Sequence, residues 1–230
     1  MSKPISALVS DILSSPAPVI LWDTCALLDI MRAVYRTEVD SRSVDRAERL
    51  LSLLFVRPRR IWSLASEIVE REFQRYELAV QLELYTLLDA LDTCATDLAR
   101  SGRYTGSYSA TTPFALALHQ LSAELISNSE IAALDTTCDR RAAYRMAAVV
   151  PPCRSRGSNN NADCRIIEHY LEIARQLSAA SFPFRVVFVS SNKRDYGEPS
   201  NIKYILGVEF STVKLDYVKD AHAAAELLGI

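Results

Sequence analysis

The sequence has 230 residues, of which 49% are apolar and 23% are charged, and its formal net charge is −2. This length suits one domain with a full hydrophobic core, and the composition argues against a disordered chain. Because the net charge gives no overall basic footprint, any positive surface for a nucleic acid must be local.

The five cysteines are odd in number and include no Cys-x-x-Cys pair. They argue against a disulfide framework and a zinc site, and they favour a reducing cytoplasm. Residues 1–19 lack the continuous apolar stretch of a secretory signal, and no segment reaches the roughly 18 apolar residues of a membrane span. We therefore expect a cytoplasmic protein with no membrane partner.

Short apolar runs alternate with longer segments of helical spacing along the chain. We expect strands at 19–22, 61–64, 186–189 and 212–217. We expect helices at 25–34, 43–55, 66–98, 114–126, 131–150, 163–177 and 220–228. This alternation predicts an α/β fold, a three-layer α/β/α sandwich around a mainly parallel central sheet.

Two aspartates follow predicted strands directly or closely. Asp23 comes directly after the run at 19–22, and Asp195 comes a few residues after the run at 186–189. Ligands of open parallel sheets bind beyond the carboxyl ends of the strands, so both aspartates are expected at the ligand-binding edge. Asp163, in the first turn of a predicted helix, lies on the core-facing side and is aimed at the same edge.

Glu72 is a charge on the apolar stripe of the predicted helix at 66–98. It lies four residues after Ile68 and four before Tyr76, so it shares their face. Burying a charge is costly unless the charge is paired or binds a metal. Glu67, in the first turn of the same helix, is explained by the helix dipole alone.

Four carboxylates at one sheet edge would repel one another strongly. Since no Lys or Arg is built into these motifs as a partner, the cluster indicates a divalent cation, and oxygen ligands favour Mg²⁺ or Mn²⁺. Taken singly, each acid has an ordinary structural explanation: Asp23 and Asp163 as helix N-terminal residues and Asp195 as a turn residue. Only the set of four indicates a function.

The motifs occur in a characteristic order. Asp23-Thr24 ends the first strand, 66–73 reads SEIVEREF, 161–168 reads NADCRIIE, and 188–196 reads FVSSNKRDY. This order resembles the PIN domain superfamily and is most similar to its larger branch with an extra helical region. The resemblance implies metal-dependent hydrolysis of phosphodiester bonds, usually in RNA, leaving a 5′-phosphate.

The resemblance also assigns roles to residues. It implies that the catalytic, metal-binding carboxylates are Asp23, Glu72, Asp163 and Asp195, with Glu67 as the alternative to Glu72. It makes Thr24, Asn161 and Asn192 supporting hydrogen-bonding residues. The whole chain, 1–230, would form one PIN-like domain, with its surplus as a helical elaboration roughly between 75 and 160.

Residues 140–156 contain five arginines and no acid. Of these, Arg145, Arg154 and Arg156 could carry a phosphate backbone toward the metal site. The equally simple alternative is a solvated helix face followed by a loop.

The sequence thus predicts a Mg²⁺- or Mn²⁺-dependent endoribonuclease with a toxin, defence or RNA-processing role. RNA is the expected substrate, DNA is the alternative, and a protein inhibitor or antitoxin and a second copy of the chain are further candidate partners. A different class remains open, a non-catalytic PIN-like module that binds RNA or protein. Nucleotide-cofactor enzymes and serine hydrolases are disfavoured, because the sequence has no Walker motif, Gly-x-Gly-x-x-Gly or Gly-x-Ser-x-Gly.

Overall fold

The computed structural model describes residues 2–36, 42–104, 111–155 and 161–230. Its centre is a five-stranded sheet in which every pair of neighbours is parallel. The strands are β1 (Val19–Trp22), β2 (Trp62–Ser66), β3 (Glu130–Ala132), β4 (Val186–Val189) and β7 (Leu215–Val218), and their order is β3-β2-β1-β4-β7. The first strand in the chain is therefore the middle strand of the sheet.

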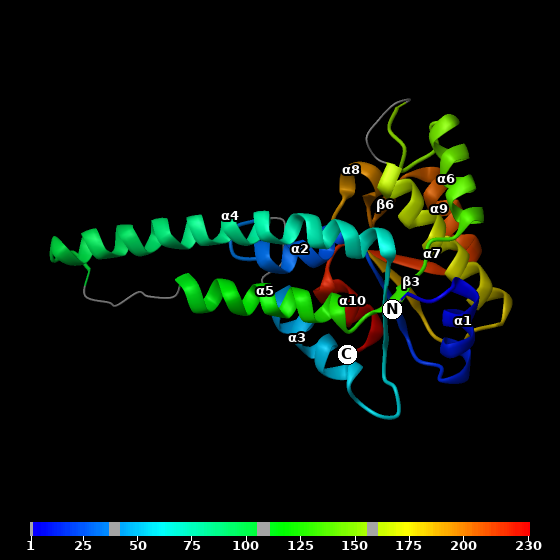
Figure 1. The fold of residues 1–230 in the computed structure, drawn as a ribbon, viewed down its shortest axis with the longest axis horizontal. Helices are drawn as coiled ribbons and strands as arrows, with labels where there is room; N and C mark the ends of the chain where they lie inside the picture. Colours follow the sequence, from blue (N-terminus) through cyan, green and yellow to red (C-terminus); the bar gives the residue numbers. More distant parts are fainter. Residues whose placement is uncertain (1, 37–41, 105–110, 156–160) are drawn as a thin grey trace.

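Helices flank this sheet on both sides (Figure 1). One group comprises α2 (Thr24–Arg32), α3 (Arg42–Leu54), α4 (Glu67–Arg100), α5 (Thr111–Ser127) and α10 (Ala221–Leu228). The other comprises α1 (Ile5–Ser14), α6 (Thr136–Ala147), α7 (Asn161–Ala179) and α9 (Tyr204–Val213). The short helix α8 (Lys193–Tyr196) and a two-stranded antiparallel sheet, β5 (Gly197–Glu198) and β6 (Asn201–Ile202), connect β4 to α9. The predicted α/β class with a parallel central sheet is confirmed.

Burial on both faces explains why the strands read as unbroken apolar runs. All four residues of β1 and all four of β4 are buried. Covering helices remove both faces of a parallel sheet from water, so such strands do not alternate with polar residues. The register places Trp22 beside Val189, and Asp23 and Ser190 therefore leave the sheet side by side.

The long helix α4 leaves the body of the protein and, together with α5, forms the arm in Figure 1. It has 34 residues, which is about 50 Å at 1.5 Å per residue. Its base buries Phe73, Val80 and Leu88, whereas Leu91 is 48% exposed. In the described ranges no helix combines the length and apolarity needed to cross a bilayer.

The sequence-based prediction left out the helices α1 and α9, and it was wrong in two further segments. Residues 131–150 were expected to be helical, but the chain first forms the edge strand β3 and only then α6, which Asp135 caps by accepting from two backbone N–H groups. A three-residue strand is too short to show a period of two. Residues 212–217 were expected to be one strand, but α9 runs to Val213 and ends at Lys214, whose φ of 56° is left-handed.

Candidate metal centre

Asp23 is the N-cap of α2 and is only 3% exposed. Its carboxylate accepts hydrogen bonds from the Thr24 backbone N–H (2.8 Å), the Ser190 hydroxyl (2.5 Å) and the Cys25 thiol (3.0 Å). Burial raises the pKa of Asp23, and these hydrogen bonds offset part of that rise. The chain thus holds an acid at the end of the central strand at an electrostatic cost.

Sequence reasoning missed Ser190 and Cys25 as members of this site. Ser190 follows β4 as Asp23 follows β1, and the parallel register makes the two residues neighbours. That pairing was the signal, but it requires knowing that β1 and β4 are adjacent. Cys25 lies two residues beyond Asp23 in the sequence, and its thiol donates to the Asp23 carboxylate.

Glu72 lies in the second turn of α4 and faces Asp23 through Thr24. The Thr24 hydroxyl donates to Glu72 Oε2 at 2.8 Å, which gives the predicted supporting residue Thr24 a definite contact. Burial raises the pKa of Glu72, and the charge of Asp23 adds to the rise. Glu67 instead forms an i,i+4 ion pair with Arg71 at 2.9 Å and does not line the cleft that contains Glu72.

Asp163, in the first turn of α7, is the carboxylate on which the other acids act most clearly. Burial and the charges of Asp23, Asp195 and Glu72 raise its pKa to about 8. The four predicted carboxylates are therefore close enough to interact electrostatically. Asn161, the first residue of α7, is exposed.

Asn192 joins two of these acids. Its side-chain amide donates to Asp163 Oδ1 at 3.1 Å and to Asp195 Oδ2 at 2.8 Å. Its own side-chain oxygen accepts from the backbone N–H of Asp195 at 3.3 Å, capping α8. The expected supporting role of Asn192 thus corresponds to a physical link between the α7 and α8 carboxylates.

The sequence predicted that no Lys or Arg is built into the cluster as a partner, and the contacts of Asp195 show that this was wrong. Its carboxylate is fully buried and receives two hydrogen bonds from the guanidinium of Arg154. Burial opposes ionisation of Asp195, but the hydrogen bonds from Arg154 and Asn192 outweigh it and lower the pKa. The signal was absent from the sequence, because the two residues are 41 positions apart and share no periodic pattern.

A cleft of about 300 Å³ runs over the cluster. Asp23, Glu72 and Asp163 line it, together with Thr24 and Asn192. Two more charged side chains that the sequence did not single out, Arg32 and Glu83, also line it. Three of the four predicted acids therefore border one opening, and Asn192 connects the fourth to it.

The arginines proposed for nucleic-acid contact divide into three cases. Arg145 is 3% exposed and its guanidinium bonds Glu168 and Glu209, so it is part of a buried ion-pair network and is removed from the proposed surface. Arg154 is 34% exposed at its side chain but is engaged by Asp195. Arg156 lies outside the described residues.

The chemistry of the donor set fits a divalent cation. All four side chains offer oxygen ligands, and burial raises the pKa of three of them, so a bound cation would relieve their mutual repulsion. Across the described ranges, however, no three His, Cys, Asp or Glu side chains already stand around one point as a ligand cage. Asp195 holds a guanidinium and Asp23 holds two side-chain donors, so metal binding requires these contacts to rearrange.

Comparison with known proteins adds no family assignment. No model of a known protein family matches the chain, and no curated protein is similar enough in sequence to count as a relative.

Proposed function

We propose that this protein is a nuclease that uses Mg²⁺ or Mn²⁺ to hydrolyse phosphodiester bonds, with RNA as its substrate. The observation that carries the proposal is the convergence of Asp23, Glu72 and Asp163 on one cleft at the carboxyl edge of a parallel sheet, with Asp195 tied to them by Asn192. Ligand sites of such sheets lie at this edge. The preference for RNA and for a PIN-like identity rests on the motif order in the sequence.

In this proposal the four carboxylates would hold the cation, and a bound cation would supply neutralisation of phosphate charge and a lowered pKa of water. The protein's own part is to hold the ligands in place. Ser190 and the backbone of Thr24 fix the Asp23 carboxylate, and the Thr24 hydroxyl fixes Glu72. Asn192 does the same for Asp163 and Asp195. Such fixed neighbours set ligand orientation and therefore metal affinity.

One observation favours a second function. The guanidinium of Arg154 already neutralises the buried Asp195, as expected of a cluster that has no need of a cation. This contact supports the alternative of a non-catalytic module that binds RNA or protein.

A cleavage assay separates the two functions. Mixed RNA and matched DNA would be incubated with Mn²⁺ or Mg²⁺ and with wild type, Asp163→Asn or Glu67→Gln. Glu67→Gln is the matched control, because it removes an acid from the same sheet edge without touching the cleft. We expect cleavage of RNA by wild type and Glu67→Gln, and none by Asp163→Asn or after chelation. Equal cleavage by Asp163→Asn, or no cleavage by wild type on either nucleic acid, would refute the proposal.

A further inference from the structure

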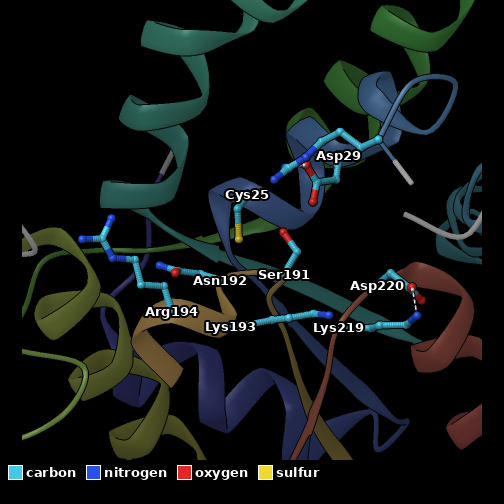
Figure 2. A pocket seen from close by; sticks show the side chains of 9 residues that line it. Cys25, Asp29, Ser191, Asn192, Lys193, Arg194, Lys219 and Asp220 are labelled. Carbon is cyan, nitrogen blue, oxygen red and sulfur yellow. Dashed lines mark hydrogen bonds and ion pairs between the residues drawn. The ribbon is translucent and has the colours of Figure 1, made fainter. Parts of the chain in front are cut away.

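A second pocket, of about 360 Å³, is shown in Figure 2 and shares Cys25 and Asn192 with the lining of the carboxylate cleft. It is built where three elements meet at the carboxyl edge of the sheet. The lining residues come from α2 and the turn behind it, from the segment after β4 and from the turn between β7 and α10. They are Cys25, Asp29, Arg36, Ser191, Asn192, Lys193, Arg194, Lys219 and Asp220.

The two cavities carry opposite charge. The lining of the second pocket has four cationic side chains and two acids, a formal charge of +2. The lining of the carboxylate cleft has four acids (Asp23, Glu72, Glu83, Asp163) and one arginine (Arg32), a formal charge of −3 with every acid ionised and −2 with Asp163 protonated. A negative cleft attracts metal cations and repels phosphate, whereas the neighbouring positive pocket attracts phosphate.

The cations of the pocket are placed to receive an anion. Figure 2 shows Lys193 reaching across the pocket toward the turn that holds Lys219 and Asp220, while Arg194 extends the opposite way past Asn192. The side chains of Lys193 and Lys219 are 39% and 40% exposed. Each is held by one acid, Lys193 by Glu198 at 2.9 Å and Lys219 by Asp220 at 3.6 Å. The Lys193–Glu198 pair is exposed on both sides, and such pairs contribute only about 0–1 kcal/mol. Asp220 is buried, but its 3.6 Å separation from Lys219 is longer than a direct hydrogen bond, and the Lys219 side chain stays 40% exposed, so a phosphate can approach both ammonium groups.

The remaining lining restricts the kind of ligand. Among the described residues around the pocket none is aromatic, so the site lacks the aromatic platform on which nucleobases commonly stack. Its polar groups suit a sugar–phosphate unit, and its volume lies in the range of small-molecule sites.

We propose that this pocket, centred on Lys193 and Lys219, binds a phosphate group of the substrate strand adjacent to the phosphate that is cut at the carboxylate cleft. The inference rests on the proposed nuclease function. It adds the direction in which the strand leaves the cleft, over Cys25 and Asn192 toward the β7–α10 turn. The phosphate is either an internal diester or the terminal monoester of the strand, and both present the same anionic oxygens to the lysines.

The test is RNA binding in the presence of a chelator, which does not depend on cleavage. Fluorescence anisotropy would compare wild type, the double variant Lys193→Gln/Lys219→Gln and the control Arg60→Gln across a salt series. Arg60 is an exposed cation just before β2, at the opposite edge of the sheet. The glutamines keep most of the side-chain length and remove only the charge, and thermal melting would verify that each variant is folded.

We expect the double variant to bind more weakly and its plot of log affinity against log salt to be shallower by about 0.7, since each neutralised phosphate of single-stranded RNA contributes about 0.7 to the slope. Arg60→Gln should match wild type. Oligonucleotides with and without a 5′-phosphate distinguish a terminal monoester in the pocket from an internal diester. A terminal phosphate in the pocket predicts a wild-type preference for the phosphorylated strand that the double variant loses, whereas an internal diester predicts equal losses on both strands.

Unchanged affinity and slope in the double variant, or no RNA binding by wild type, would overturn the inference. Failure of the nuclease proposal gives a different result. In that case binding would depend on the two lysines, but no strand would be cut when Mn²⁺ replaces the chelator.

Discussion

Replacing Asp163 with asparagine is expected to stabilise the metal-free protein while removing its response to metal. The pKa of Asp163 is raised from 3.8 to about 8 by burial and by the neighbouring acids. An acid whose pKa is higher in the folded than in the unfolded state binds its proton more tightly when folded. Its contribution to stability is therefore greatest below pH 4 and declines as the pH rises toward 8.

The magnitude follows from the interval between the unfolded pKa and the working pH. At pH 7 Asp163 is ionised in the unfolded chain and protonated in the folded protein. The interval from the unfolded pKa to pH 7 is about three pH units, and at about 1.4 kcal/mol per unit wild type loses at most about 4 kcal/mol of unfolding free energy. Asparagine has no charge to lose, and its side-chain oxygen can still accept the bond from Asn192. The variant should therefore be more stable than wild type at pH 7 and 8, and the two should converge at pH 4.

Urea unfolding of both proteins at pH 4, 7 and 8, with a chelator and with Mn²⁺, measures this difference. Wild type should gain stability from Mn²⁺, because the cation binds only the folded state, and Asp163→Asn should not. If Asp163→Asn with chelator is less stable than wild type with chelator at pH 7, the argument is refuted, since Asp163 would then be a stabilising charge. An equal gain from Mn²⁺ in both proteins would place the metal elsewhere.

Three further predictions concern neighbouring contacts. Arg154→Gln frees the Asp195 carboxylate and should tighten Mn²⁺ binding several-fold by calorimetry, and weaker binding would show that the arginine supports the site. Ser190→Ala removes a hydrogen bond to buried Asp23 and should cost about 1–3 kcal/mol in unfolding free energy at pH 8, where a loss near zero would contradict it. Arg145→Met leaves Glu168 and Glu209 without their shared cation and should cost about 3–5 kcal/mol by chemical denaturation, whereas a stable variant would show that the acids find other partners.

Three of the candidate acids, Asp23, Glu72 and Asp195, could be located from the sequence. Asp23 and Asp195 were placed by the rule that parallel strands share one ligand-binding edge, and the structure positions both there. Glu72 was identified as a charge on an apolar stripe, and it borders the cleft as that reasoning required. Local pattern and a general rule of sheet topology were enough for these residues.

The remaining features depend on which segments become neighbours in space. The pairing of Arg154 with Asp195 joins a turn to a buried carboxylate and leaves no periodic trace in the sequence. The edge strand β3 has three residues and takes its structure from pairing with β2, so propensity alone could not distinguish it from the start of a helix. Arg145 was taken for a surface cation because its two partners come from α7 and α9, which no spacing rule connects to α6.

The sheet order has a consequence for synthesis on the ribosome. The central strand β1 is made first, but its neighbour β4 follows more than 160 residues later, and Asp163 and Asp195 also come from this last part of the chain. Until then one edge of β1 has no partner and the candidate site lacks two of its four predicted acids. Parallel pairing between strands so far apart in the chain forms late, because the entropic cost of closing the long intervening loop comes before the contacts that offset it. The candidate site is therefore complete only after the last third of the chain has been made.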